Sequence, residues 1–474
     1  PAQLRLAFEE LLAHHLAVRR RRRYRESSVA PVIPIGKSLW PKLEKRLGFS
    51  LTRAQQRTIC EVLTDLSQSR PSLRLIQGDV GCGKTIVAAA AALAAVEAGL
   101  QVVVMAPTEL LAEQHFRTFS KWLKGFDLTP VWLTGKLGAR ERREARSLLA
   151  TGQAKIGIGT HALFQEDVHY RALGLVIVDE QHRFGVEQRL ALREKGREGN
   201  QLPHQLVMTA TPIPRSLTMV LHADMDVSII DEMPPGREPV ETVVVPNSRR
   251  NEVQERVRRA CADGQRAYWV CPLITESDLL EAEAAIQRAE ALTKELPDLR
   301  IALLHGRMLS AEKETLMEAF RAGGVDLLVA TTVIEVGVDV PEASLMVIEN
   351  AERLGLAQLH QLRGRIGRGG QRAVCVLLYQ APIGPVAHDR LAMLRQTNDG
   401  FTIARKDLEL RGPGEVLGTR QTGYPEFRIA DFVRHQTVFE WVPNAADQLL
   451  KIDPERADAL IRRWVRVADG LSYV

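Results

Sequence analysis

A glycine-rich segment in the first quarter of the chain constrains the fold more than any other feature. Gly78–Thr85 reads Gly-Asp-Val-Gly-Cys-Gly-Lys-Thr and has the spacing of a phosphate-binding loop. The apolar run Leu73–Gln77 precedes it, and the alanine-rich stretch Ile86–Ala98 follows it as an expected buried helix. In this strand–loop–helix context, backbone N–H groups and the helix N-terminus bind phosphate. The glycines expected to let the backbone curl around phosphate are Gly78, Gly81 and Gly83.

Short apolar runs alternate with helical patterns along most of the chain. The expected strands of a first unit are Leu73–Gln77, Val102–Ala106, Lys155–Gly159, Gly174–Val178 and Gln205–Thr209. After the turn-forming Pro234-Pro235-Gly236, those of a second unit are Ala267–Cys271, Arg300–Leu304, Asp326–Ala330, Leu345–Glu349 and Ala373–Tyr379. Such runs predict two α/β lobes, each with a parallel sheet covered by helices on both faces.

The pattern also predicts where the lobes begin and end. We place the first lobe at residues 49–235 and the second at 236–385. Residues 1–48 are expected to form a linker helix and a connector, because leucine and phenylalanine recur between residues 4 and 16 at the spacing of one helix face. Residues 386–474 depart from the alternating pattern and predict a C-terminal helical element, in which Asp453-Pro454 is a helix start.

Composition narrows the class of protein without defining it. The 474 residues are 45% hydrophobic and 26% charged, and no apolar run is long enough to span a membrane, so we expect no membrane association. The five cysteines are scattered without metal-ligand spacing, so we expect neither zinc nor disulfides and predict a cytoplasmic protein. The net charge of +5 suits a polyanionic partner but does not identify one.

Two carboxylates, Asp179 and Glu180, directly follow the strand expected at 174–178. Because the carboxyl ends of parallel strands meet at the ligand edge of a sheet, these side chains should lie beside the phosphate loop. We predict that Lys84 binds the β- and γ-phosphates of ATP and that Thr85 and Asp179 hold Mg²⁺. Glu180 is then expected to orient or deprotonate the attacking water.

The second lobe contains an arginine-rich segment, Gln361–Arg368, which reads Gln-Leu-Arg-Gly-Arg-Ile-Gly-Arg. Arg365 and Arg368 follow Gln361 at about the spacing of helical turns. A planar guanidinium can contact phosphate through two N–H groups and can neutralise charge that develops during phosphoryl transfer. The repeated glycines argue against an exposed basic helix. We therefore predict that Gln361, Arg365 and Arg368 complete the ATP site from the second lobe.

Four further positions carry weaker signals. Phe49 is able to stack on adenine and Gln55 to hydrogen-bond its edge, but a phenylalanine more often lies in the core. Thr209 and Thr211, in Thr-Ala-Thr-Pro, either couple the nucleotide to the second lobe or form a plain strand-ending turn.

In this order, the segments resemble the motifs of superfamily-two helicases and translocases, which implies two tandem RecA-like lobes that close on ATP and Mg²⁺. Segments similar to that superfamily's nucleic-acid-contacting motifs are Ala106–Leu111, Thr134–Lys136, Gly159–Ala162, Leu304–Met308 and Ala330–Asp339. The resemblance implies nucleotide contacts from Gly337 and Asp339. The residues implied in DNA contact or coupling are Thr108, Thr134, Lys136, Thr160, Thr209, Thr211, His305, Arg307, Thr331, Arg411, Arg420 and Gln421.

Within that superfamily, the chain resembles the RecG family of bacterial DNA helicases. The segments that carry this resemblance are Asp179–Arg189, Asp231–Arg237, Ala351–Gly369 and Gly400–Gly423. The last is similar to a translocation motif shared with the transcription-repair coupling factor, in which a helical hairpin and loop convert lobe closure into movement on duplex DNA. Arg405 stands where that motif has a glutamate. RecG proteins also carry an N-terminal wedge domain without a counterpart here, so we expect the motor portion.

The resemblance implies an ATP-dependent translocase or helicase on double-stranded DNA that remodels branched DNA, such as stalled forks and Holliday junctions, in recombination and repair. We also expect a monomer, with single-stranded DNA-binding protein as a partner. The sequence leaves two alternatives open: a coupling-factor-like translocase that displaces RNA polymerase, and a SecA-type protein-translocating ATPase. It also leaves open whether Arg19–Arg23 contacts DNA phosphates or is a solvated run on the linker helix.

Overall fold

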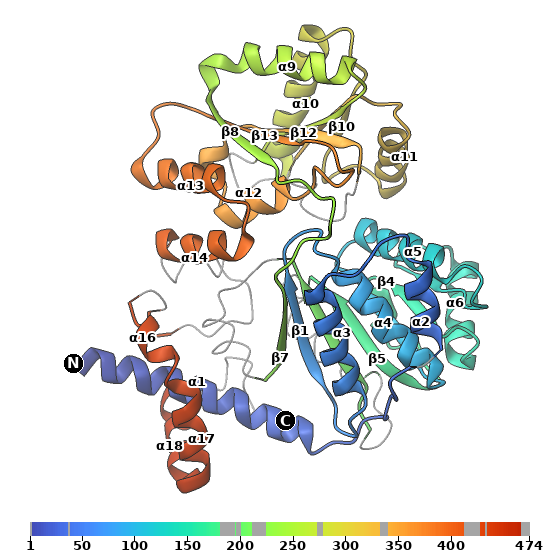
Figure 1. Cartoon of the computed structure of the whole chain (residues 1–474), viewed down its shortest axis with the longest axis vertical. Coiled ribbons are helices and arrows are strands. Elements are labelled where there is room, and N and C mark those ends of the chain that lie inside the picture. The colour runs from blue at the N-terminus through green and yellow to red at the C-terminus, as the bar shows by residue number, and fades with distance from the viewer. Residues whose placement is uncertain are drawn as a thin grey trace.

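Two parallel sheets, each covered by helices, form the two lobes of the chain (Figure 1). The computed structural model describes residues 2–36, 38–180, 195, 201–210, 224–272, 278–331, 340–411, 427–431 and 434–465. The α/β fold class and the two tandem lobes predicted from the sequence are confirmed.

The first lobe is built on a seven-stranded sheet in the order β3-β4-β2-β5-β6-β1-β7, and all its neighbouring strands are parallel. Its strands are β1 (Leu73–Gly78), β2 (Gln101–Met105), β3 (Val131–Leu133), β4 (Ile156–Gly159), β5 (Leu173–Asp179), β6 (His204–Thr209) and β7 (Asp226–Ile230). Its helices are α2 (Leu39–Arg46), α3 (Arg53–Leu66), α4 (Lys84–Glu97), α5 (Glu109–Leu123), α6 (Ala139–Thr151) and the short η1 (His161–Phe164).

Helices cover both faces of this first sheet. Val102 and Val104 of β2 pack with α3 and α4 on one face, whereas Val103 and Met105 pack with α6 and η1 on the other. Successive side chains of a strand point to opposite faces, so a strand covered on both sides needs an unbroken apolar run. This requirement explains why the central strands were recognisable in the sequence.

The second lobe has a six-stranded parallel sheet in the order β10-β11-β9-β12-β13-β8. Its strands are β8 (Glu241–Pro246), β9 (Arg266–Val270), β10 (Ile301–Leu304), β11 (Leu327–Ala330), β12 (Ala343–Ile348) and β13 (Val374–Tyr379). Its helices are α9 (Arg250–Ala262), α10 (Asp278–Glu295), α11 (Ser310–Arg321), α12 (Leu356–Arg363), α13 (Pro385–Gln396), η3 (Asn247–Arg249) and η5 (Ala351–Arg353). Helices α9 and α10 cover one face, while α11, α12 and α13 cover the other.

Three strands, β3, β7 and β8, were not expected from the sequence. Each lies at an edge of its sheet, and most of its side chains are only partly buried. An edge strand is covered by neighbours on fewer sides, so it does not need a continuous apolar run. The sequence signal on which the strand predictions rested is therefore weak at these positions, although the remaining edge strand, β10, was expected at 300–304.

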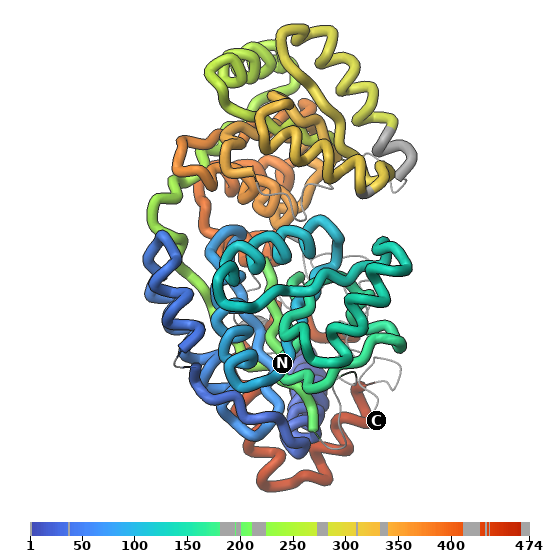
Figure 2. The backbone as a smooth tube through the Cα atoms, turned by 90° about the vertical axis from the view of Figure 1, so that its right-hand side faces the viewer, coloured from blue at the N-terminus to red at the C-terminus, as the bar shows by residue number. Residues whose placement is uncertain are grey.

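Helices from the two ends of the chain pack against each other below the first lobe (Figures 1 and 2). They are α1 (Ala2–Glu26), α16 (Gln436–Phe439), α17 (Val442–Ile452) and α18 (Pro454–Trp464), while α14 (Gly400–Arg411) lies against α12 and α13 in the second lobe. The Asp453 carboxylate accepts a hydrogen bond from the Arg456 N–H at 2.9 Å, which confirms the predicted start of α18. Leu4, expected on the apolar face of α1, is instead 43% exposed.

Three arginines of the run in α1 make ion pairs within the protein. Arg19 pairs with Asp447 of α17 at 3.3 Å, and Arg20 pairs with Asp458 of α18 at 2.6 Å. Arg22 reaches Asp226 of β7 at 3.0 Å. The run therefore joins α1 to the C-terminal helices and to the first lobe, a role that neither sequence interpretation anticipated. No helix among the described residues combines the length and apolar character needed to cross a membrane.

Candidate active site

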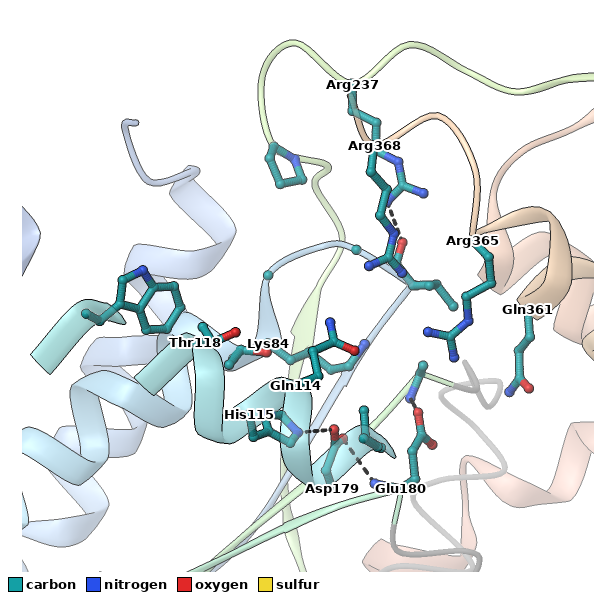
Figure 3. A pocket seen from close by; sticks show the side chains of 18 of the residues that line it. Lys84, Gln114, His115, Thr118, Asp179, Glu180, Arg237, Gln361, Arg365 and Arg368 are labelled. Atoms are coloured by element: carbon teal, nitrogen blue, oxygen red, sulfur yellow. Dashed lines mark hydrogen bonds and ion pairs between the residues drawn. The ribbon is translucent and has the colours of Figure 1, made fainter. Parts of the chain in front are cut away.

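A cavity of about 420 Å³ lies between the two lobes (Figure 3). The cavity is lined by both lobes. The first lobe contributes residues of the phosphate loop, α5 and the end of β5, and the second contributes α12 and the coil after it, with the connector between the lobes. They are Val80, Gly81, Gly83, Lys84, Thr85, Leu111, Gln114, His115, Thr118, Trp122, Asp179, Glu180, Ala210, Pro234, Pro235, Gly236, Arg237, Gln361, Arg365 and Arg368. All five predicted catalytic residues line it, although they come from distant parts of the sequence.

The phosphate loop forms the floor of the cavity at the start of α4. Gly81 and Gly83 have φ angles of 80° and 88°, a left-handed conformation that a side chain would strain. The Lys84 ammonium donates hydrogen bonds to the backbone carbonyls of Gly78 at 2.7 Å and Asp79 at 3.0 Å. The loop is therefore folded back on its lysine, with the N-terminus of a helix facing the cavity, which is the arrangement that binds phosphate.

Asp179, at the end of β5, is held by a histidine that the sequence analysis did not single out. The His115 Nε2 and the Asp179 Oδ2 lie 2.7 Å apart, and both side chains are buried. Burial opposes ionisation of Asp179, but the hydrogen bond with His115 and the nearby charge of Lys84 hold its pKa below the usual value. Asp179 is therefore a carboxylate with a fixed orientation toward the cavity.

Glu180 has a different electrostatic environment from its neighbour. Burial, together with the adjacent Asp179 charge, raises the pKa of Glu180 to about 7, although Lys84 and Arg365 oppose the shift. The Oε1 of Glu180 accepts a hydrogen bond from the Ala210 N–H at 3.2 Å, and its φ angle is 52°. A carboxylate with a pKa near neutrality is suited to taking a proton from water.

The second lobe contributes Gln361, Arg365 and Arg368. Helix α12 ends at Arg363, so the two arginines follow Gln361 on the coil beyond the helix and not on successive helical turns as expected. Figure 3 shows all three side chains on the second-lobe side of the cavity, opposite Lys84 and the two carboxylates. Arg237 of the interlobe connector lies beside Arg368 and is a further cavity residue that the sequence analysis did not select.

The donor set of the cavity fits a magnesium ion that is bound mainly through a nucleotide. The described residues contain no group of three or more His, Cys, Asp or Glu side chains that would hold a metal unaided. Thr85 supplies a hydroxyl and Asp179 a carboxylate on the same cavity wall. Mg²⁺ prefers such oxygen ligands, few in number, with phosphates and waters completing its coordination.

Phe49 and Gln55, the predicted adenine contacts, do not line this cavity. Phe49 is 51% exposed. Gln55 is buried beneath the phosphate loop, where its Nε2 donates to the Cys82 carbonyl at 2.8 Å and its Oε1 accepts from the Thr52 N–H at 2.9 Å. Gln55 thus supports the loop from below, and its contact with adenine stays a prediction.

The residues implied in DNA contact have varied surroundings. Thr134, Thr160, Thr209 and Thr331 are buried as whole residues, and their contact with DNA stays a prediction. The Thr108 hydroxyl caps α5 by accepting from the Leu111 N–H at 3.3 Å, and Lys136 pairs with Glu109 at 2.6 Å. His305 and Arg307 lie on the loop after β10, and Arg411 ends α14. Thr211, Gly337, Asp339, Arg420 and Gln421 lie outside the described residues.

Three family models match the chain in succession. Residues 52–220 match the DEAD/DEAH box helicase family, and residues 251–370 match the helicase conserved C-terminal domain. Residues 397–464 match domain 3, C-terminal, of the ATP-dependent DNA helicase RecG. Together with the two RecA-like lobes and the cavity between them, these matches define a helicase motor.

Individual proteins make the assignment more specific. The chain is 56% identical to ATP-dependent DNA helicase RecG of Acidithiobacillus ferridurans over 98% of its own length and 67% of that protein, and 54% identical to the Pasteurella multocida RecG over 100% and 68%. The chain belongs to the RecG family of ATP-dependent DNA helicases. A solved structure of RecG bound to a three-way DNA junction matches with a TM-score of 0.76 and 44% identity, over 93% of this chain and 57% of that one. The chain thus spans about two thirds of the length of these two curated relatives and 57% of the length of the solved chain.

Proposed function

We propose that this chain hydrolyses ATP between its two lobes to move along double-stranded DNA and thereby remodel branched DNA, such as stalled replication forks and Holliday junctions. The observation that carries the proposal is the shared cavity, in which Arg365 and Arg368 of the second lobe face Lys84, Asp179 and Glu180 of the first. Because each lobe supplies only part of the site, hydrolysis depends on the position of one lobe relative to the other. A change in this relative position is also the movement that drives a motor along DNA.

Each cavity residue has a proposed role in ATP hydrolysis. The loop N–H groups and Lys84 bind the β- and γ-phosphates, and Glu180 accepts the proton of the attacking water. Arg365 and Arg368 neutralise charge that develops on the transferred phosphoryl group, while Gln361 orients the water. Thr85 and Asp179 would hold Mg²⁺, which supplies charge neutralisation for the phosphates when bound.

The proposed substrate is DNA that contains a branch. Support comes from the family membership and from the related structure, whose RecG is bound to a three-way DNA junction. The 54–56% identity to RecG proteins over nearly the whole chain favours this function over a SecA-type protein translocase or a coupling-factor-like translocase. We propose that the chain acts as a monomer in the cytoplasm and that single-stranded DNA-binding protein is a partner.

The test compares ATP hydrolysis by this chain with duplex DNA, single-stranded DNA, a model fork and an unfolded protein. We expect duplex and forked DNA to stimulate hydrolysis, and the unfolded protein to have no effect. Fork unwinding, measured on the same preparation, then separates movement from hydrolysis. Gln421→Ala is expected to keep much of the DNA-stimulated hydrolysis and to lose unwinding, as suits a coupling residue. Stimulation by unfolded protein alone would contradict the proposal.

A further inference from the structure

We propose that Asp79 and His360 are positioning residues: they join the phosphate loop directly to the arginine segment and so set the register of the two half-sites before nucleotide binds. The inference rests on the proposed function, because the register matters only if ATP is hydrolysed between the lobes. Neither residue lines the active-site cavity. Asp79 belongs to the phosphate loop of the first lobe, and His360 belongs to α12 of the second. Their contact lies immediately beside the cavity.

The contact is short and buried. The His360 Nε2 lies 2.6 Å from the Asp79 Oδ1, although the two residues are 281 positions apart in sequence. The exposed fraction of His360 is 4% and that of Asp79 is 8%. A hydrogen bond to a charged group contributes more when water is excluded, and a buried carboxylate without a partner is costly. Each residue therefore has a strong reason to keep the other in place.

The direction of the hydrogen bond follows from a third residue. Arg363 donates to the His360 Nδ1 at 2.9 Å, and a guanidinium has no acceptor. The Nδ1 must therefore accept, which leaves the Nε2–H to donate to Asp79. Arg363 is itself anchored within the second lobe by the Leu394 carbonyl at 2.7 Å and the Thr397 carbonyl at 2.9 Å. The imidazole is thus fixed on both sides.

Two further contacts bring the same backbone segments together. The Arg237 guanidinium, on the connector between the lobes, donates to the Val80 carbonyl at 2.6 Å and to the Gly364 carbonyl at 3.0 Å. Gly364 also packs so closely that a Cβ atom added there would lie 2.8 Å from the Cβ of Val80. We call the contacts of Asp79, Val80, Arg237, His360 and Gly364 the interlobe joint.

The interlobe joint lies next to Arg365, so its loss should affect ATP turnover more than nucleotide binding. Arg365 directly follows Gly364 and lines the cavity, so a shift of the joint moves the guanidinium that the proposed function assigns to the transferred phosphoryl group. Lys84 and the N–H groups of the phosphate loop belong to the first lobe and are left unaltered when His360 is removed, so they remain able to bind nucleotide. Its loss should therefore lower kcat far more than it raises the KM for ATP, because the lost interaction acts mainly in the transition state.

The kinetic test is a double-mutant cycle with duplex DNA present. His360→Ala is expected to lower kcat roughly 10- to 100-fold, with the KM for ATP within about 3-fold, since small misplacements of a reacting group have effects of this size. Asp79→Ala also removes the hydrogen bond that the Val80 N–H donates to the Asp79 Oδ1 at 2.7 Å, so it should lower kcat at least as far and raise the KM as well. The double variant should be no worse than Asp79→Ala alone, because the two residues act through one shared contact. His360→Gln, whose amide can still donate to Asp79, should recover most of kcat. His388→Ala, which changes an exposed histidine of α13, is the matched control and should match the unaltered chain.

The interlobe distance supplies a measurement that does not depend on catalysis. Spin labels on Cys60, an exposed cysteine of the first lobe, and on an Asp263→Cys variant in the second should give a narrow distance distribution without nucleotide. His360→Ala should broaden it. Unchanged distances and kcat in His360→Ala, or losses that multiply in the double variant, would overturn the inference. The two proposals can also fail separately. If His360→Ala broadens the distance distribution but duplex DNA does not stimulate hydrolysis, the interlobe joint is supported and the proposed function is contradicted.

Discussion

The two halves of the active-site cavity are held in place in different ways. In the first lobe, the two carboxylates are fixed by neighbours from the same lobe: Asp179 by His115 at 2.7 Å and Glu180 by the Ala210 N–H at 3.2 Å. In the second lobe, the arginines lie on coil that follows α12, and the contacts beside them cross to the other lobe. The first half is therefore assembled by folding of one lobe, whereas the second depends on both.

This difference separates nucleotide binding from nucleotide turnover. The first lobe alone presents the phosphate loop, Lys84 and the carboxylates, so it should bind nucleotide wherever the second lobe lies. In the proposed mechanism, hydrolysis requires Arg365 and Arg368 as well. A motor needs this separation, because DNA can then control turnover by changing the position of one lobe.

Among the residues of the first lobe, the largest effects are expected at Glu180 and Lys84. Glu180→Gln keeps the shape of the side chain but cannot accept a proton, so kcat should fall roughly 100- to 10,000-fold. Lys84→Ala should reduce hydrolysis comparably, because it removes the ammonium that binds the phosphates. Steady-state hydrolysis with duplex DNA measures both effects. Glu166→Gln and Lys121→Ala, at exposed positions of the same lobe, are the controls. Undiminished hydrolysis in either active-site variant would contradict the assigned site.

An intermediate effect is expected at His115, which supports the half-site from within the lobe. His115→Ala removes the hydrogen bond that orients Asp179, and loss of such a partner typically weakens metal binding about 10- to 100-fold. The Mg²⁺ concentration that gives half-maximal hydrolysis should rise accordingly, while saturating Mg²⁺ should restore much of kcat. His169→Ala, an exposed histidine of the same lobe, provides the comparison. An unchanged Mg²⁺ requirement would show that His115 serves only folding.

The smallest effect on hydrolysis is expected at Glu10, which lies outside both half-sites. Its buried carboxylate accepts hydrogen bonds from the N–H groups of Arg428, Ile429 and Ala430 at 2.6, 2.9 and 2.8 Å. Glu10→Gln should speed hydrogen exchange at these amides about 10- to 100-fold, because each bond to a charged group is weakened. ATP hydrolysis should change little. Glu9→Gln, at the neighbouring partly buried glutamate that pairs with Arg5, should leave exchange at these amides unchanged, and equal exchange in both variants would refute the anchoring role.

The sequence predicted those parts of the fold that are buried on both faces. Central strands such as β2 and β5 form unbroken apolar runs, and the phosphate loop has fixed spacing between glycines, lysine and threonine. Edge strands such as β3 and β8 have mixed exposure and gave no comparable pattern. The first half of the site was therefore predictable, because its residues occupy contiguous motifs at strand ends.

The supporting contacts were not predictable in the same way. His115 and Asp179 are 64 residues apart, and His360 and Asp79 are 281 apart, so no local pattern pairs them. A lone histidine on a helix is ordinary in any sequence. The arginine run of α1 shows the same limit, because the aspartates that pair with it lie on β7, α17 and α18. Pairings of this kind are set by tertiary packing.

The most direct test of a site shared between the lobes is ATP hydrolysis by Arg365→Gln in the presence of duplex DNA, measured beside nucleotide affinity. The account predicts that kcat falls by about 1,000-fold or more, as for other arginines that act on a transferred phosphoryl group, while nucleotide affinity changes little. Arg372→Gln, an exposed arginine of the same lobe paired with Glu241, should behave like the unaltered chain. Full hydrolysis in Arg365→Gln would show that the first lobe acts alone and would contradict the account.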